Sequence, residues 1–197
     1  MKIVAVIAAR GGSKRLKHKN IYPLFDKPML AWAIEACQRS KYICDVLVSS
    51  DDSNILSVAD DYNAVCIDRP SDLSDDFTPK MEVIRHADKW HKQNYNIEVD
   101  IVVSVQANSP ELNTKDIDDG IEMLLENSLY EVISVGKDMI QNASFRVIKQ
   151  SSLYNTFLSA HIGVIVNQCI DVHTLDDIEA IEARHKNINQ FTQFITQ

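Results

Sequence analysis

One short loop carries most of the side chains that could do chemistry. Residues 8–21 (AARGGSKRLKHKNI) combine a glycine pair with several lysines and arginines. Glycines let a backbone turn tightly and bring its N–H groups close to an anion, while lysine and arginine side chains neutralise its charge. The residues that could hold an anion in this way are Arg10, Gly11, Gly12, Ser13, Lys14 and Lys19.

The spacing of the two glycines excludes two common phosphate-binding motifs. The P-loop, G-x-x-x-x-G-K-[ST], needs an upstream glycine that is missing here, and the dinucleotide fingerprint needs G-x-G-x-x-G. From its residues alone, the loop therefore predicts an anion site without naming the anion. A merely structural glycine turn remains an alternative.

The chain as a whole is acidic, with a formal net charge of −8 over 197 residues. A protein that binds nucleic acid should show a basic face or stripe, so no nucleic-acid partner is expected. A compact basic loop on an otherwise acidic chain suits a small polyanion, such as a nucleoside triphosphate, better than a polymer. A solvated run of charge is the ordinary alternative for such a cluster.

The elements on either side of the loop must position it. Residues 2–9 (KIVAVIAA) are nearly all apolar and rich in β-branched side chains, which is typical of a strand buried on both faces of a parallel sheet. Open α/β sheets bind ligands just beyond the carboxyl ends of such strands. Further strands are expected at residues 46–49, 64–67 and 100–106, and helices at residues 28–40, 53–62, 79–91 and 114–127.

From residue 131 the pattern changes, and three strands are expected with little helix between them, at residues 132–135, 144–149 and 161–166. A final helix is expected at residues 174–184, because Thr174 and Asp177 have capping-box spacing. The tail from Lys186 is expected to be a short strand or disordered.

Together these elements predict an α/β fold, a three-layer sandwich around a mostly parallel, Rossmann-like mixed sheet. No linker or internal repeat interrupts the sequence, so residues 1–197 are expected to form a single domain.

The four cysteines and the hydropathy pattern bear on location. Cys37, Cys44, Cys66 and Cys169 lack metal-ligand spacing, and are expected to be reduced, mostly buried thiols of a cytoplasmic protein. No apolar run approaches the ~20 residues that cross a bilayer, and the first residues lack the pattern of a signal peptide. No membrane association is expected.

Several motifs, in order along nearly the whole chain, resemble those of the acylneuraminate cytidylyltransferases. That family makes CMP-sialic acid, and close relatives act on pseudaminic, legionaminic or 3-deoxy-octulosonic acids. The most specific match is the ARGGSK loop followed by the pair Lys19-Asn20. The other matches are VSSDD at residues 48–52, Arg69-Pro70, QANSP at residues 106–110 and DVHTLDD at residues 171–177.

The resemblance implies the fold of the nucleotide-diphospho-sugar transferases, a homodimer and a Mg²⁺-dependent reaction. The anomeric hydroxyl of a sialic-acid-like 2-keto sugar acid would attack the α-phosphate of CTP, and pyrophosphate would leave. Gln106 and Ser109 would contact the sugar, although loop-shaping roles for both remain open. Catalytic roles would fall on Arg10, Lys19 and Asp171, and nucleotide contacts on Arg10, Gly11, Gly12, Ser13, Lys14, Asn20 and Arg69.

The chain departs from the family pattern at the expected metal site. The family has D-x-D before its last helix, whereas this chain has Asp171-Val172-His173. Mg²⁺ prefers oxygen ligands, so Asp171 is expected to bind it directly, and His173 to reach it through water or to bond a phosphate. A structural histidine, a transition-metal site and weakened catalysis remain alternatives.

The acceptor side departs from the pattern as well. The chain is shorter than typical members between residues 149 and 171, so the dimerisation and acceptor region around residues 150–170 is expected to be reduced. Lys137, Arg146 and Lys149 are candidate partners for the carboxylate of the sugar. A nucleotidylyltransferase for a different sugar, and a nucleotide-binding paralogue with impaired catalysis, are the rival functions.

Overall fold

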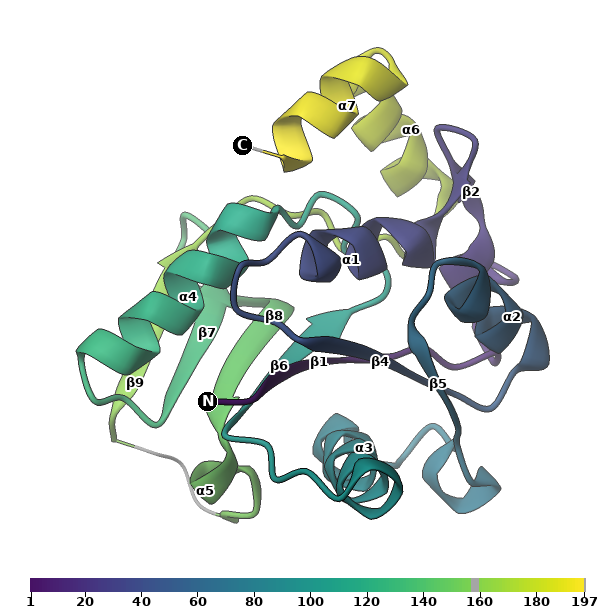
Figure 1. Cartoon of the computed structure of the whole chain (residues 1–197). Coiled ribbons are helices and arrows are strands. Elements are labelled where there is room, and N and C mark those ends of the chain that lie inside the picture. The colour runs from purple at the N-terminus through teal and green to yellow at the C-terminus, as the bar shows by residue number, and fades with distance from the viewer. Residues whose placement is uncertain (157–159, 197) are drawn as a thin grey trace.

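The structure is a computed structural model that describes residues 1–156 and 160–196. Its middle layer is a seven-stranded sheet with the strand order β5-β4-β1-β6-β8-β7-β9 (Figure 1). Its strands are β1 (Ile3–Ala8), β4 (Asp45–Ser50), β5 (Val65–Asp68), β6 (Ile101–Gln106), β7 (Glu131–Val135), β8 (Gln141–Lys149) and β9 (Ile162–Val166).

The four strands β5, β4, β1 and β6 run parallel to one another. Strands β1 and β6 form the centre of the sheet, and five of the six residues in each are buried, as their apolar sequences predict. Their registers bring Ala8 and Gln106 side by side at the carboxyl ends. The residues that follow these two strands therefore emerge at the same edge of the sheet.

The expected change of pattern after residue 131 is confirmed. Strand β8 lies antiparallel to both β6 and β7, and β9 pairs in parallel with β7 at the outer edge. The sheet is thus mixed but mostly parallel, and the expected α/β class is confirmed.

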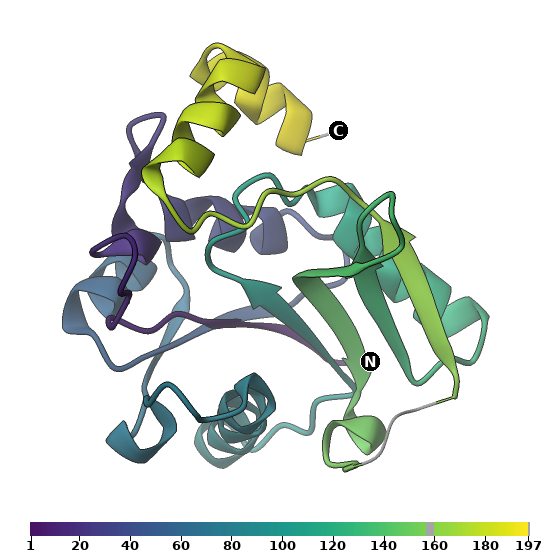
Figure 2. The same ribbon diagram turned by 180° about the vertical axis from the view of Figure 1, so that it is seen from behind.

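Helices cover both faces of the sheet and complete three layers (Figures 1 and 2). Helices α1, α2 and α4 share one apolar core with the sheet, whereas α3 packs on the opposite face with Val4, Val6 and Val102. The bounds of these helices are α1 (Met29–Gln38), α2 (Ser53–Asp61), α3 (Lys80–Tyr95) and α4 (Thr114–Glu126).

A third core joins the two ends of the chain. A small hairpin, β2 (Pro23–Leu24) with β3 (Lys27–Pro28), and the start of α1 pack against α6 (Leu175–His185) and α7 (Ile188–Ile195). The capping box expected at Thr174 and Asp177 starts α6 and is confirmed.

The prediction for the tail was wrong, because residues 188–195 form the helix α7 rather than a strand or a disordered segment. Asn187 caps the helix by accepting a hydrogen bond from the Gln190 N–H at 3.0 Å. Phe191 then buries its ring edge-on against Trp32, with the ring centroids 4.8 Å apart. The apolar spacing of Ile188, Phe191 and Ile195 suits a helix face and was the signal that was missed.

The remaining elements are short: η1 (Lys19–Ile21), η2 (Ser71–Leu73) and α5 (Gln150–Leu153). The region around residues 150–170 holds α5 and β9, and its residues 157–159 lie outside the described part. All four cysteines are free, but only Cys37 is fully buried, so the expectation of mostly buried thiols was wrong. Among the described residues, no helix is both long and apolar enough to cross a membrane.

Candidate active site

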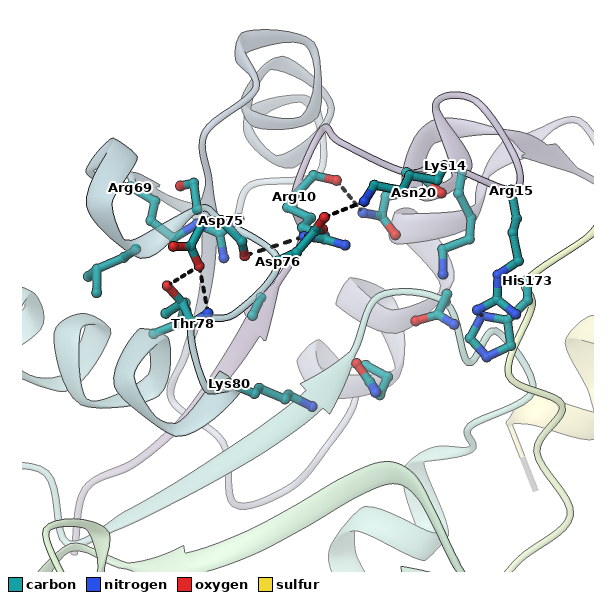
Figure 3. A pocket seen from close by; sticks show the side chains of 18 residues that line it. Arg10, Lys14, Arg15, Asn20, Arg69, Asp75, Asp76, Thr78, Lys80 and His173 are labelled. Atoms are coloured by element: carbon teal, nitrogen blue, oxygen red, sulfur yellow. Dashed lines mark hydrogen bonds and ion pairs between the residues drawn. The ribbon is translucent and has the colours of Figure 1, made fainter.

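A pocket of about 490 Å³ opens where β1 and β6 end. It brings together the basic loop, the segment between β5 and α3, the end of β6 and the segment before α6 (Figure 3). The candidate residues that line it are Arg10, Ser13, Lys14, Lys19, Asn20, Arg69, Gln106 and His173. Gly11, Gly12, Ser109 and Asp171 do not line it.

Hydrogen bonds to neighbouring segments fix the shape of the basic loop. The buried Asn20 side chain donates to the Arg10 carbonyl at 3.0 Å, which ties the end of the loop to its beginning. The Gly11 N–H donates to Asp51 Oδ1 at 3.2 Å, so this amide is already used within the protein. A Cβ on Gly11 would lie 2.5 Å from Asp52 Oδ2, and this close approach requires glycine.

Asp51 also binds Arg69, so one carboxylate joins the loop to the far wall of the pocket. Arg69 Nη2 donates to Asp51 Oδ1 at 3.0 Å, and the arginine is only 6% exposed. Burial alone would raise the pKa of Asp51, but the hydrogen bonds from Arg69 and the Gly11 N–H lower it below its ordinary value. Arg69 Nε is buried without a hydrogen-bond partner in the described part of the chain. A group bound in the pocket could accept from it.

Two cations of the basic loop are held by an internal carboxylate. Arg10 Nη1 and Lys14 Nζ both pair with Asp76, one with each carboxylate oxygen (Figure 3). Arg10 also donates to the Asp75 carbonyl at 3.3 Å. The Asp75 side chain accepts from the Thr78 hydroxyl at 2.7 Å, and this bond shapes the turn that presents Asp76. The pocket thus supplies its own anion at the place where phosphates are expected.

Two lysines in the pocket have no such partner. Neither Lys19 Nζ nor Lys80 Nζ makes a hydrogen bond or ion pair with any residue in 1–156 or 160–196. Burial lowers the pKa of Lys19, although Asp171 opposes this shift. Burial lowers the pKa of Lys80 to about 8, again opposed by Asp171 and assisted by Arg146. Asp171 lies near enough to act on both lysines without lining the pocket itself.

The segment after β6 holds Asp171 and His173 in place. Asn108 and Val172 exchange two hydrogen bonds, from Val172 N–H to the Asn108 carbonyl at 2.8 Å and from Asn108 Nδ2 to the Val172 carbonyl at 3.0 Å. The buried Ser109 hydroxyl donates to Asp171 Oδ1. Ser109 therefore positions a carboxylate in this structure instead of lining the pocket as a sugar contact.

His173 bonds the basic loop across the pocket. Arg15 Nη2 lies 3.1 Å from His173 Nδ1, and only an unprotonated Nδ1 can accept from an arginine (Figure 3). Burial and the positive charges of Lys19 and Arg15 lower the pKa of His173 and favour the neutral ring. This leaves Nε2 as the ring atom able to bond a water or a phosphate.

The carboxylates around the pocket decide whether a Mg²⁺ ion shared with a bound nucleotide could be held there. In the described part of the chain, no three His, Cys, Asp or Glu side chains form a metal-binding cluster. Nearby Asp177 is occupied as the acceptor of the α6 capping box. Asp75 and Asp76 line the pocket but are bonded to Thr78 and to the cations of the basic loop. Asp171 makes no ion pair in the described part of the chain and stays the candidate ligand, since Mg²⁺ commonly takes one or two carboxylates plus substrate phosphates.

The candidate partners for an acidic acceptor lie outside this pocket. Arg146 binds Glu131 through Nε at 2.8 Å. Lys149 lies over the Tyr130 ring at 5.8 Å, and Lys137 lines a separate surface depression. Sequence reasoning missed Lys80 and the pair Asp75-Asp76. A cation in the first turn of a helix opposes the helix dipole, and this was a readable signal for Lys80.

Comparison with known proteins identifies the family of the chain. A family model described as cytidylyltransferase matches residues 4–186. N-acylneuraminate cytidylyltransferase A of Danio rerio is 34% identical over 133 residues, which cover 68% of this chain and 30% of that protein. Pseudaminic acid cytidylyltransferase of Campylobacter jejuni is 35% identical over 128 residues, which cover 64% of this chain and 55% of that protein. The chain spans about a fifth to just over half the length of such relatives.

Solved structures support the fold. A CMP:2-keto-3-deoxy-manno-octonic acid synthetase complexed with CTP superimposes with a TM-score of 0.73 at 15% identity, covering 93% of this chain and 98% of that one. A 4-diphosphocytidyl-2C-methyl-D-erythritol synthase from Anaerococcus prevotii gives a TM-score of 0.62 at 14% identity, covering 94% and 99%.

Proposed function

Because this chain belongs to the cytidylyltransferase family, we propose that it transfers CMP from CTP to a sialic-acid-like 2-keto sugar acid and releases pyrophosphate. The observation that carries this proposal is the convergence of six cationic side chains on one pocket beyond β1 and β6. They are Arg10, Lys14, Arg15, Lys19, Arg69 and Lys80. A nucleoside triphosphate carries about four negative charges and an acidic acceptor carries one more, and such a site can neutralise them.

The residues of the chain divide the work of binding and charge stabilisation. Arg10, Lys14 and Lys19 hold the phosphates, and Asn20 keeps the loop that carries them closed. Lys19 lies near enough to Asp171 to feel its charge, so the charge that grows on the leaving pyrophosphate forms beside a fixed cation of the basic loop. Phosphoryl transfer depends mainly on such alignment and charge stabilisation.

Mg²⁺ is the proposed cofactor, with Asp171 as its direct protein ligand. When bound, the ion would draw charge from the phosphate oxygens and reduce their repulsion of the incoming hydroxyl. Ser109 holds Asp171 in position through its hydroxyl. His173 would bond a metal-bound water or a phosphate through Nε2.

The direct test is pyrophosphate release with CTP, Mg²⁺ and each of three acids: N-acetylneuraminic, pseudaminic and N,N′-diacetyllegionaminic acid. Release with CTP and one of these acids, but not with ATP or GTP, is the expected result. CTP consumption with a different sugar only would contradict the sialic-type acceptor.

A second candidate is a nucleotide-binding protein with impaired turnover, which is favoured because no three His, Cys, Asp or Glu side chains of the described residues form a metal-binding group. H173D separates the two functions by adding a second carboxylate. If the native site is impaired, H173D should raise turnover at least ~10-fold at limiting Mg²⁺, while CTP binding measured by calorimetry stays similar. A wild type that turns over at a rate that H173D leaves unchanged or lowers would reject the impaired function.

Homodimerisation and a cytoplasmic location complete the proposal. The edge strand β9 exposes Ile162, Val164 and Val166 along one side, and a row of apolar side chains on the last strand of a sheet suits a subunit contact. The four free cysteines suit a reducing compartment.

A further inference from the structure

Lys80 is the cation of the pocket that the phosphate-binding loop does not supply. It is the first residue of α3, and its side chain extends into the pocket opposite Arg15 and His173 (Figure 3). The N-cap position is Pro79, which offers no side-chain cap. Thr78, Lys80 and Val83 all line the pocket, so α3 begins at its wall, where the positive end of the helix dipole would favour an anion beside Lys80.

The partners of the other cations set Lys80 apart. Arg10 and Lys14 pair with Asp76, Arg15 bonds His173, and Arg69 pairs with Asp51. Lys19 is unpaired among the described residues, but it belongs to the basic loop that the triphosphate would occupy. Lys80 is also unpaired there, comes from another element, and has Val83 and Gln106 as companions in the pocket lining.

Keeping Lys80 charged in this position is costly to the free protein. Burial and the neighbouring Arg146 lower its pKa to about 8, and Asp171 offsets only part of this shift. An anion bound beside the ammonium would remove that cost. The protein therefore holds a cation that is better stabilised with a ligand than without one.

The geometry of a 2-keto sugar acid matches this cation. In such an acid the carboxylate and the reacting hydroxyl are attached to the same carbon atom. A cation that binds the carboxylate must then lie beside the reacting centre, close to the proposed metal ligand. Lys80 meets this condition because it lines the same pocket as Gln106 and His173, and His173 lies two residues after Asp171.

We propose that Lys80 binds the carboxylate of the acceptor sugar acid and selects acceptors that carry this acid next to the attacking hydroxyl. The inference rests on the proposed function, and it names the acceptor contact that Lys137, Arg146 and Lys149 do not provide.

The test uses K80M, which keeps length and removes charge, and K80R, which keeps charge. K115M is the control, because Lys115 is paired with Asp119 on the surface of α4, outside the pocket. Kinetics of pyrophosphate release are measured against N-acetylneuraminic acid and against its carboxamide, which has a similar shape without the charge. CTP binding is measured by calorimetry.

The expected result is a fall in kcat/KM for the acid of about 10- to 100-fold in K80M, the range for losing a charged hydrogen bond. K80R and K115M should keep most of the wild-type value. With the carboxamide, wild type and K80M should be equal, and CTP affinity should change less than about 3-fold.

Two outcomes overturn the inference while leaving the proposed function intact: equal kcat/KM for the acid in active wild type and K80M, or a loss of CTP affinity in K80M that explains its whole defect. Wild-type protein that releases no pyrophosphate with any of the three acids contradicts the proposed function, and this inference with it. If K80M does not fold, as judged by circular dichroism, K80Q takes its place.

Discussion

At the scale of single residues, Asp76 occupies two of the cations that a bound nucleotide would use. Its carboxylate pairs with Arg10 and Lys14, and these two cations lower its pKa. A triphosphate that uses the same two side chains must first displace Asp76. Binding would then be an exchange of one anion for another, and its net gain is smaller than the number of cations suggests.

D76N should therefore tighten CTP binding. The asparagine keeps the shape of the side chain but not its charge. Arg10 and Lys14 can then bind the phosphates without first breaking ion pairs with a carboxylate. A 2- to 5-fold lower Kd is expected in low salt, a factor of about the size of exposed ion pairs, and the difference should shrink as salt rises. Calorimetry measures both.

The matched control is D26N, at an exposed aspartate of the β2–β3 hairpin outside the pocket. This substitution should leave the Kd unchanged. Weaker binding of CTP by D76N would show that Asp76 helps to hold the nucleotide, and would reject its role as a competing anion.

At the scale of elements, the first turn of α4 carries a carboxylate, Asp116, whose charged form is destabilised by burial. Burial raises the pKa of Asp116 to about 6, Asn167 opposes this shift through a hydrogen bond, and Asp119 adds to it. Ionised Asp116 thus destabilises the folded state. This cost is fully present above about pH 6, and is lost as the pH falls from there toward the ordinary value of 3.8.

D116N should remove this dependence on pH. The free energy of unfolding of D116N relative to wild type should rise by about 1 kcal/mol between pH 5 and pH 8. Urea unfolding at both pH values, followed by circular dichroism, gives the difference. D119N, at the exposed neighbour that pairs with Lys115, is the control and should change far less between the two pH values. If the difference in free energy of unfolding between D116N and wild type is the same at pH 5 and pH 8, ionisation of Asp116 does not destabilise the folded state.

The helices, strands and contacts of the fold differ in how far the sequence predicts them. The β-branched runs of β1 and β6 and the capping box of α6 depend on neighbours in sequence, and their positions were predicted. The pairing of Arg10 with Asp76 joins residues 66 positions apart, and no local pattern encodes it. Lys80 differs, because a cation in the first turn of a helix is a local signal, but only the packing of α3 on the sheet brings that cation to the pocket.

At the scale of the whole molecule, the third core ties the pocket to the C-terminal helices. Phe191 packs against Phe25, Trp32 and His185. His185 and Arg184 donate to the buried Glu111, which also accepts from the Ile170 N–H at 3.0 Å. Contacts thus run continuously from α7 to the segment that carries Asp171.

F191A should destabilise the protein by about 3–5 kcal/mol, the cost of emptying a buried aromatic site. Phe194 packs only at the edge of this core, so F194A is the control and should cost less than half as much. Chemical unfolding measures both. If F191A and F194A lower the free energy of unfolding equally, the central position of Phe191 does not make it more important to this core than Phe194.

The bond between Arg15 and His173 joins side chains 158 positions apart, and this separation has a consequence for synthesis. A ribosome adds about 5–20 residues per second, so the basic loop emerges roughly 8–30 s before the histidine that will face it. During that interval Trp32 and Leu24 also lack the helices that cover them. A nascent chain would expose an incomplete anion site and an apolar surface together, which is a natural target for chaperones.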